Sequence, residues 1–106
     1  MYAIIVTIGR NVGTAPMSDT RWAEFIEDVR GTLCQNTFER QRAQLNTTEG
    51  MGEWDGIPEP NAQVTVLLRS QISDESKDLL RRDLSELARL YEQEAIAVMF
   101  ATSELC

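Results

Sequence analysis

Two helical patterns, each lying between segments of strand-like alternation, constrain the fold of this chain more than any other feature of its sequence. In the first, apolar residues recur at helical spacing over 22–33, and Ser18 is a suitable N-cap for the helix that they predict. In the second, leucines recur at helical spacing over 80–87, with Ser73 as N-cap. We therefore expect one helix over about 19–34 and a second that begins after Ser73.

Four further segments favour strands. Residues 2–9 are apolar on both alternating faces, most strongly at the even positions, which is typical of a strand in the centre of a sheet. Residues 63–69 and 95–102 alternate with one apolar face each. Residues 37–46 are polar and alternate weakly, which suits an edge strand, where charge discourages pairing with other chains.

The order of these elements, β-α-β-β-α-β, predicts an α+β fold of the ferredoxin-like type. A four-stranded antiparallel sheet would carry two helices on one face, and the right-handed crossover rule puts the first and third strands in the centre. The length suits a single domain over residues 1–106. Residues 46–62, between the second and third strands, hold several glycines and prolines, and we interpret them as one long loop of a kind that is often functional.

Charge and composition exclude several functions. A net charge of −7 disfavours non-specific binding to nucleic acid or anionic lipid, which depends on Lys and Arg. The absence of histidine excludes Ser-His-Asp and Cys-His catalysis and His-ligated metals, and Cys34 and Cys106 form no metal-site pattern. No apolar run approaches the ~20 residues of a membrane helix. We expect a cytoplasmic protein without a cofactor, a metal or a membrane partner.

Several separate segments meet at one end of the predicted sheet. The turn after the first strand, the N-terminus of the first helix, the 46–62 loop and the residues before the last strand all lie there. A helix N-terminus beside Arg10 favours an anion, and Trp54 could stack on a planar ligand. Arg40 and Arg42, on the second strand, could line a wall. The candidate ligand-binding residues are Arg10, Asn11, Trp54, Glu59, Gln93, Glu94, Arg40 and Arg42.

Structural roles for some of these residues remain open alternatives. Arg10 could pair with Glu59 or Glu94, and Trp54 could fold back over the core. Trp22 lies on the helical stripe and is expected in the core. The carboxylates of the loop could hold Mg²⁺ or Ca²⁺, but their spacing does not match the calcium-loop pattern, and a solvated acidic loop is the simpler interpretation.

The sheet face away from the helices is expected to be small and apolar rather than charged. It should carry Ile5, Leu67 and Met99 among smaller residues. An exposed apolar face of this kind usually marks an interaction surface, and pairing of two copies through it is the simplest closed arrangement. We therefore predict a homodimer whose interface includes these three residues.

Four short motifs give the chain a resemblance to known proteins. In chain order the motifs are Gly9-Arg10, Gly52-Glu53-Trp54, Pro58-Glu59 and Tyr91-Glu92-Gln93-Glu94. They resemble small α+β proteins of bacteria and actinobacteriophages that have no assigned activity. The resemblance implies that one group of residues belongs together, namely Arg10, Trp54, Glu59, Gln93 and Glu94.

Three functions remain after these exclusions. The first is a non-catalytic, homodimeric binding protein that holds a small anionic or nucleotide-like ligand at Arg10, Asn11 and Trp54, as a phage protein that sequesters a signalling nucleotide would. The second is an acidic interaction module that inhibits a host protein. The third is an enzyme that works with carboxylates alone, with Glu59 and Glu94 as acid and base. The sequence favours the first.

Overall fold

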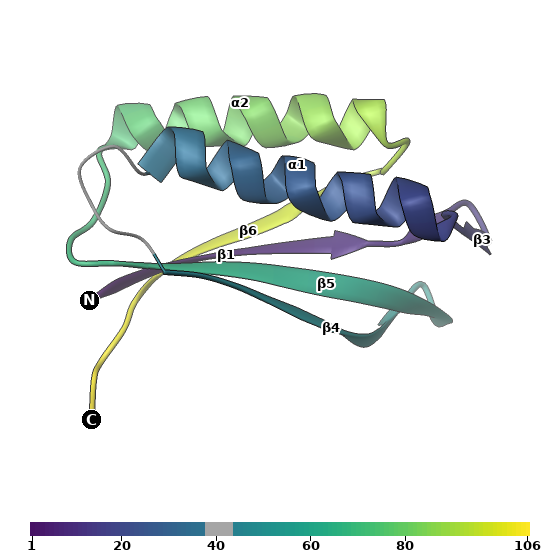
Figure 1. The fold of residues 1–106 in the computed structure, drawn as a ribbon, viewed down its shortest axis with the longest axis horizontal. Helices are drawn as coiled ribbons and strands as arrows, with labels where there is room; N and C mark the ends of the chain where they lie inside the picture. The colour runs from purple at the N-terminus through teal and green to yellow at the C-terminus, as the bar shows by residue number, and fades with distance from the viewer. Residues whose placement is uncertain (38–43) are drawn as a thin grey trace.

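The computed structural model describes residues 1–37 and 44–106, without the side chains of Gln44 and Trp54. The predicted β-α-β-β-α-β order is present, and a small hairpin of two short strands follows the first strand (Figure 1). In chain order the elements are β1 (Tyr2–Gly9), β2 (Asn11–Val12), β3 (Ala15–Pro16), α1 (Asp19–Thr37), β4 (Gln44–Trp54), β5 (Ile57–Leu68), α2 (Asp74–Leu90) and β6 (Ala97–Thr102).

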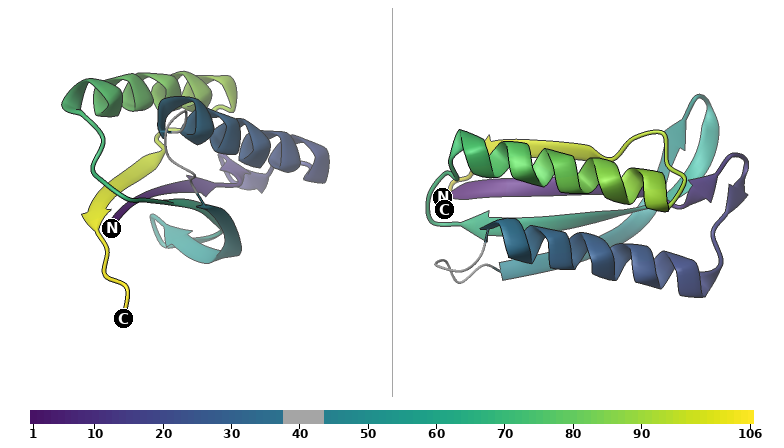
Figure 2. Two further views of the ribbon diagram at one scale, coloured as in Figure 1. Left: turned by 60° about the vertical axis from the view of Figure 1, so that its left-hand side comes forward. Right: turned by 90° about the horizontal axis from the view of Figure 1, so that it is seen from above.

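The four long strands form one antiparallel sheet in the order β4-β5-β1-β6. Both helices lie side by side over one face of this sheet, and the described chain leaves the other face uncovered (Figures 1 and 2). β1 and β5 are central, as the crossover rule predicts. The predicted fold class is therefore confirmed: an α+β fold with a four-stranded antiparallel sheet and two helices on one face, in the ferredoxin-like arrangement. Of the described helices, none combines the length and hydropathy needed to cross a membrane.

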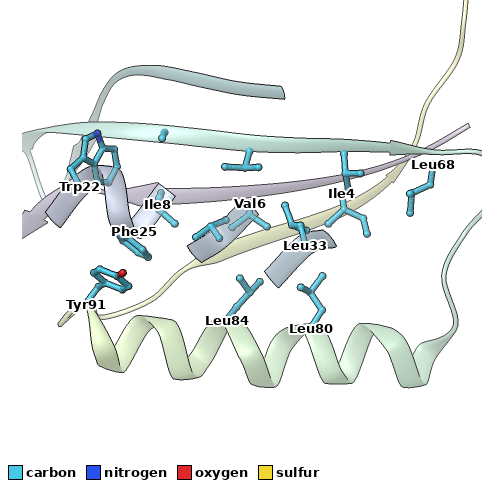
Figure 3. Close-up of a cluster of buried hydrophobic side chains, with 14 of the residues drawn as sticks. Ile4, Val6, Ile8, Trp22, Phe25, Leu33, Leu68, Leu80, Leu84 and Tyr91 are labelled. Atoms are coloured by element: carbon cyan, nitrogen blue, oxygen red, sulfur yellow. The ribbon is translucent and has the colours of Figure 1, made fainter. Parts of the chain in front are cut away.

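The core lies between the sheet and the two helices (Figure 3). Even-numbered side chains of β1 and β5 point into it, among them Ile4, Val6 and Val66, each 0% exposed. The helices contribute the apolar stripes that the sequence shows, and Trp22 is buried in the core as expected. The core side chains of the helices include Trp22, Phe25, Val29, Leu33, Leu80 and Leu84.

The prediction of a long loop over 46–62 is wrong. β4 and β5 form a hairpin that pairs as far as Trp54 and Ile57, so that only Asp55 and Gly56 connect the two strands. Both connecting residues have a positive φ, 51° and 76°, as the central residues of a type I′ hairpin turn require.

Pro58 and Pro60 belong to β5, although proline usually interrupts a strand. Their carbonyl oxygens accept hydrogen bonds from the β1 side: Pro60 from the N–H of Arg10 at 2.9 Å, and Pro58 from the side chain of Asn11 at 3.5 Å. In an antiparallel strand the N–H and C=O of one residue point to the same side, so the N–H groups that proline does not have would also face away from β4. The pairing with β4 is intact, and the hairpin continues past the end of β1 (Figure 2).

α1 is longer than predicted and ends at Thr37, which the sequence suggested as the start of a strand. Thr37 is buried, and its hydroxyl donates to a backbone carbonyl one turn earlier at 2.6 Å. The predicted strand over 37–46 is therefore wrong at its start, whereas its end lies in β4, from Gln44 onward. Arg40 and Arg42 lie outside the described residues.

Candidate functional site

A pocket of about 330 Å³ opens at the end of the sheet where β1 stops and the β4–β5 hairpin continues. We call it the sheet-end pocket. Residues of β1, β2, β4 and β5 line it, together with the segment between α2 and β6. Its polar lining residues include Asn11, Glu59, Asn61, Gln93 and Glu94.

Glu59 is fixed in the pocket by backbone contacts. Its Oε2 accepts a hydrogen bond from the backbone N–H of Asn11 at 3.0 Å. The carboxylate also lies directly over Gly9, where a Cβ atom would be only 2.4 Å from Oε1. Glycine at this position therefore leaves the space that the Glu59 carboxylate occupies.

Asn61 stands two residues further along β5, on the same face of the sheet. Its cross-strand neighbours are Gly9 on β1 and Gly50 on β4. The amide leans toward Gly52, where a Cβ atom would lie 2.7 Å from the Asn61 Nδ2. Glycines on both neighbouring strands thus leave the space that the side chains of Glu59 and Asn61 occupy.

The segment 92–95 forms another wall of the pocket. Gln93 ties it to β2, because its Nε2 donates to the backbone carbonyl of Asn11 at 3.0 Å. Glu92 has a φ of 55°, the left-handed conformation in which many chains leave a helix. Asn11 therefore contacts two walls at once, through its N–H to Glu59 and through its carbonyl to Gln93.

Tyr91 anchors the start of this wall in the core. Its ring stacks on Phe25 with 4.3 Å between the centroids, and its hydroxyl donates to the Asp28 carboxylate. Burial, with the hydrogen bond to Asp28 as the second cause, raises the pKa of Tyr91 to about 12. The phenol therefore stays protonated at neutral pH and acts as a fixed donor.

The structure brings Asn11, Glu59, Gln93 and Glu94 together at the sheet-end pocket, where the topology argument places them. Trp54 is the last residue of β4 and follows the lining residue Glu53. The role of these residues in ligand binding stays a prediction, as does that of Arg40 and Arg42.

Arg10 is not among the lining residues of the pocket. Its Nε donates to the Met17 carbonyl at 2.9 Å, and its NH2 group pairs with Asp19 at 2.6 Å. The alternative pairing with Glu59 or Glu94 is therefore wrong. Arg10 instead joins β1 to the start of α1, and Asp19 neutralises the charge that was expected to attract an anion.

The charged residues in the described lining of the pocket are all acidic. They are Glu53, Glu59, Glu92 and Glu94, and the lining includes no Lys or Arg. Carboxylates that converge on a cavity attract cations and repel anions. The pocket therefore disfavours the anionic ligand that the sequence suggested and favours a ligand with positive charge.

Sequence reasoning missed Gly50, Gly52 and Asn61, because they lay in a segment interpreted as a loop. A signal for the hairpin was present, since Asp55-Gly56 is a frequent two-residue hairpin turn. Once the strand is recognised, the spacing of Gly50 and Gly52 puts both on one face. The spacing of these glycines does not show which side chain fills the space beside them.

Comparison with known proteins shows a shared fold and no sequence family. No family model and no curated protein matches the chain. Among solved structures, a phage SAM lyase in its apo state has a TM-score of 0.64 and 17% identity, over 94% of this chain and 78% of that one. A phage SAM lyase in complex with S-methyl-5′-thioadenosine has a TM-score of 0.56 and 17% identity, over 94% of this chain and 79% of that one.

These neighbours correct the functional prediction. The sequence favoured a non-catalytic binding protein, and this is contradicted because these two structural neighbours are of an enzyme. At 17% identity the likeness itself shows the fold alone, so that an enzymatic function of this chain is open. The resemblance of the sequence to phage proteins has distant support, because both structural neighbours are phage proteins at 17% identity.

Proposed function

We propose that this chain is an enzyme that cleaves a sulfonium nucleoside of the S-adenosylmethionine type in the sheet-end pocket. The observation that carries the proposal is the charge of the pocket, whose described lining holds four glutamates and no basic residue. S-Adenosylmethionine has a sulfonium and an ammonium group, which carboxylates attract. The fold shared with a phage SAM lyase, and the S-methyl-5′-thioadenosine in one of its structures, support this ligand class.

Cleavage of the bond between sulfur and the methionine side chain yields S-methyl-5′-thioadenosine. The electron pair of the broken bond passes to sulfur, which loses its positive charge, so the step needs no oxidant or reductant. The four-carbon fragment leaves in one of two ways. Attack by its own carboxylate on the carbon that carried sulfur gives a lactone, whereas loss of the neighbouring proton to a base gives an unsaturated amino acid.

Glu59 and Glu94 are the carboxylates to which we assign this chemistry, in line with the carboxylate-only enzyme that the sequence left open. Glu59 is oriented by the N–H of Asn11 and is suited to face the sulfonium or to accept a proton. Glu94 is exposed at the wall and is suited to hold the ammonium group.

Product formation tests the proposal. We expect the purified chain to convert S-adenosylmethionine into S-methyl-5′-thioadenosine, measured by liquid chromatography, while the second product identifies the route. Glu59→Gln keeps the shape of the side chain but removes its charge, and we expect a rate at least ~100-fold lower. Glu86→Gln, the same change at an exposed position of α2 outside the pocket lining, should leave the rate unchanged.

The proposal fails if the wild-type chain neither forms the thioadenosine nor binds S-adenosylmethionine in a calorimetric titration. It also fails in its residue assignment if Glu59→Gln and Glu86→Gln have equal effects on the rate.

A further inference from the structure

The Asn61 amide is a polar group in the sheet-end pocket that the proposed cleavage leaves without a role. Its side chain is partly exposed and has no hydrogen-bond partner among the described residues, whereas Glu59 and Gln93 are both held by Asn11. An amide in a pocket offers a donor and an acceptor at once. Groups of this kind usually fix the orientation of a ligand and its specificity.

The pocket of about 330 Å³ that Asn61 lines has room for a flat ring. Gly9 and Gly50 flank Asn61 on the neighbouring strands, and Gly52 lies under its amide. The Glu59 carboxylate fills the space over Gly9, and the Asn61 amide fills the space over Gly52. A planar group in the pocket would therefore meet these two side chains rather than bare backbone.

Glu59 and Asn61 lie on one face of β5 with one residue between them, which separates their Cα atoms by roughly 7 Å. One small ligand can therefore contact both. A carboxylate suits the cationic sulfur of a sulfonium nucleoside, and a neutral amide suits its base. The pocket thus has a charged part and a hydrogen-bonding part that correspond to the two parts of such a ligand.

We propose that Asn61 selects adenine, its amide forming paired hydrogen bonds with the 6-amino group and the N7 atom of the base. An Asn side chain can pair with adenine in this bidentate way because adenine presents a donor beside an acceptor. Hypoxanthine has a carbonyl in place of the amino group and so presents two acceptors, O6 and N7, on this edge, which the amide cannot pair in the same way. This inference rests on the proposed function, since it names the base that the same pocket recognises.

The test compares two neutral ligands that differ only at this edge, S-methyl-5′-thioadenosine and S-methyl-5′-thioinosine. Calorimetric titration of the wild-type chain should give a dissociation constant roughly 10- to 100-fold lower for the adenine compound. Asn61→Ala should bring the ratio of the two constants close to one. Asn61→Leu, which keeps the branched shape of the side chain without its polar groups, should also bring the ratio close to one. This variant controls for the empty space that alanine leaves.

Gln63→Ala is the matched control, because Gln63 is the next amide on the same face of β5 and does not line the pocket. The ratio of the two dissociation constants should keep its wild-type value in Gln63→Ala. Circular dichroism should show that all variants are folded. Equal binding of both ligands by the wild-type chain overturns the inference while the proposed function stands. The inference is also overturned if the ratio of the two dissociation constants keeps its wild-type value in Asn61→Ala and Asn61→Leu. Binding of neither the two probes nor S-adenosylmethionine removes the proposed function and this inference together.

Discussion

On the face of the sheet that α1 and α2 cover, β5 presents Val64, Val66 and Leu68, none more than 1% exposed. On the other face, the same strand presents Glu59 and Asn61, with glycines as their neighbours on β1 and β4. Because successive side chains of a strand point to opposite faces, one segment can serve both purposes. The core and the lining of the pocket are thus divided between alternate residues of the same strands, and each of the following predictions tests that division.

Phe25→Ala should have the largest effect on stability. Phe25 is 0% exposed and stacks on Tyr91, so truncation leaves a cavity between the sheet and the helices. We expect the free energy of unfolding to fall by about 3–5 kcal/mol, measured by urea denaturation. A loss below about 1 kcal/mol would show that the covered face does not carry the stability of the fold.

Gly9→Ala should act mainly on the pocket. The added methyl group would collide with the Glu59 carboxylate, which must then leave its position beside the Asn11 N–H. Under the proposed function we expect the rate of thioadenosine formation to fall by roughly 100-fold.

Gly31→Ala is the control for this change. Gly31 lies in α1, and a Cβ atom there would meet nothing within 4 Å. Alanine at this position should raise the stability by about 0.5–1 kcal/mol and leave the rate unchanged. If Gly9→Ala formed thioadenosine at the wild-type rate, this would show that Glu59 has no part in the reaction.

Tyr91→Phe should change how stability depends on pH. The pKa of Tyr91 is raised from 10.0 to about 12 in the folded chain, so folding favours the protonated phenol. The contribution is complete below pH 10 and is lost as the pH rises toward 12. Urea denaturation at a series of pH values should show a steeper loss over this range for the wild type than for the variant. At neutral pH the variant should be less stable by about 1 kcal/mol, from the lost hydrogen bond to Asp28.

Met99→Glu should have the smallest effect on folding. Met99 lies on the uncovered face, 58% exposed, and its cross-strand neighbour is Ile5. A substitution at such a site should change the free energy of unfolding by no more than about 0.5 kcal/mol. If the homodimer predicted through Ile5, Leu67 and Met99 forms, the variant should be monomeric in size-exclusion chromatography with light scattering. A wild-type chain that is monomeric at high micromolar concentration would contradict that dimer.

The sequence predicted the elements whose pattern is dictated by burial. Helical spacing identified α1 and α2, and alternation identified β1, β5 and β6, because one face of each element must meet the core. The β4–β5 hairpin was missed because its outer half reaches beyond the core, where no apolar pattern is imposed. There, Gly50 and Gly52 were interpreted as breaks in a loop, whereas in the sheet Gly52 lines the pocket and Gly50 lies beside Asn61.

Part of the candidate site could also be predicted, because the topology of the sheet follows from the order of its elements. Topology alone placed Asn11, Glu59, Gln93 and Glu94 at one end of the sheet, and the structure has them there. The direction of a long side chain does not follow from topology. Arg10 turns toward Asp19 rather than the pocket, and this reversed the expected charge of the ligand.

The two hydrogen bonds by which Asn11 joins the pocket walls use its main chain, since its N–H contacts Glu59 and its carbonyl contacts Gln93. Main-chain groups are nearly the same for every amino acid, so many residues at position 11 would support both walls equally well. A pocket held in this way can persist while the side chains around it drift. Related proteins could then share the cavity long after their sequences cease to be recognisably alike, and a search for them should compare backbones rather than residue identities.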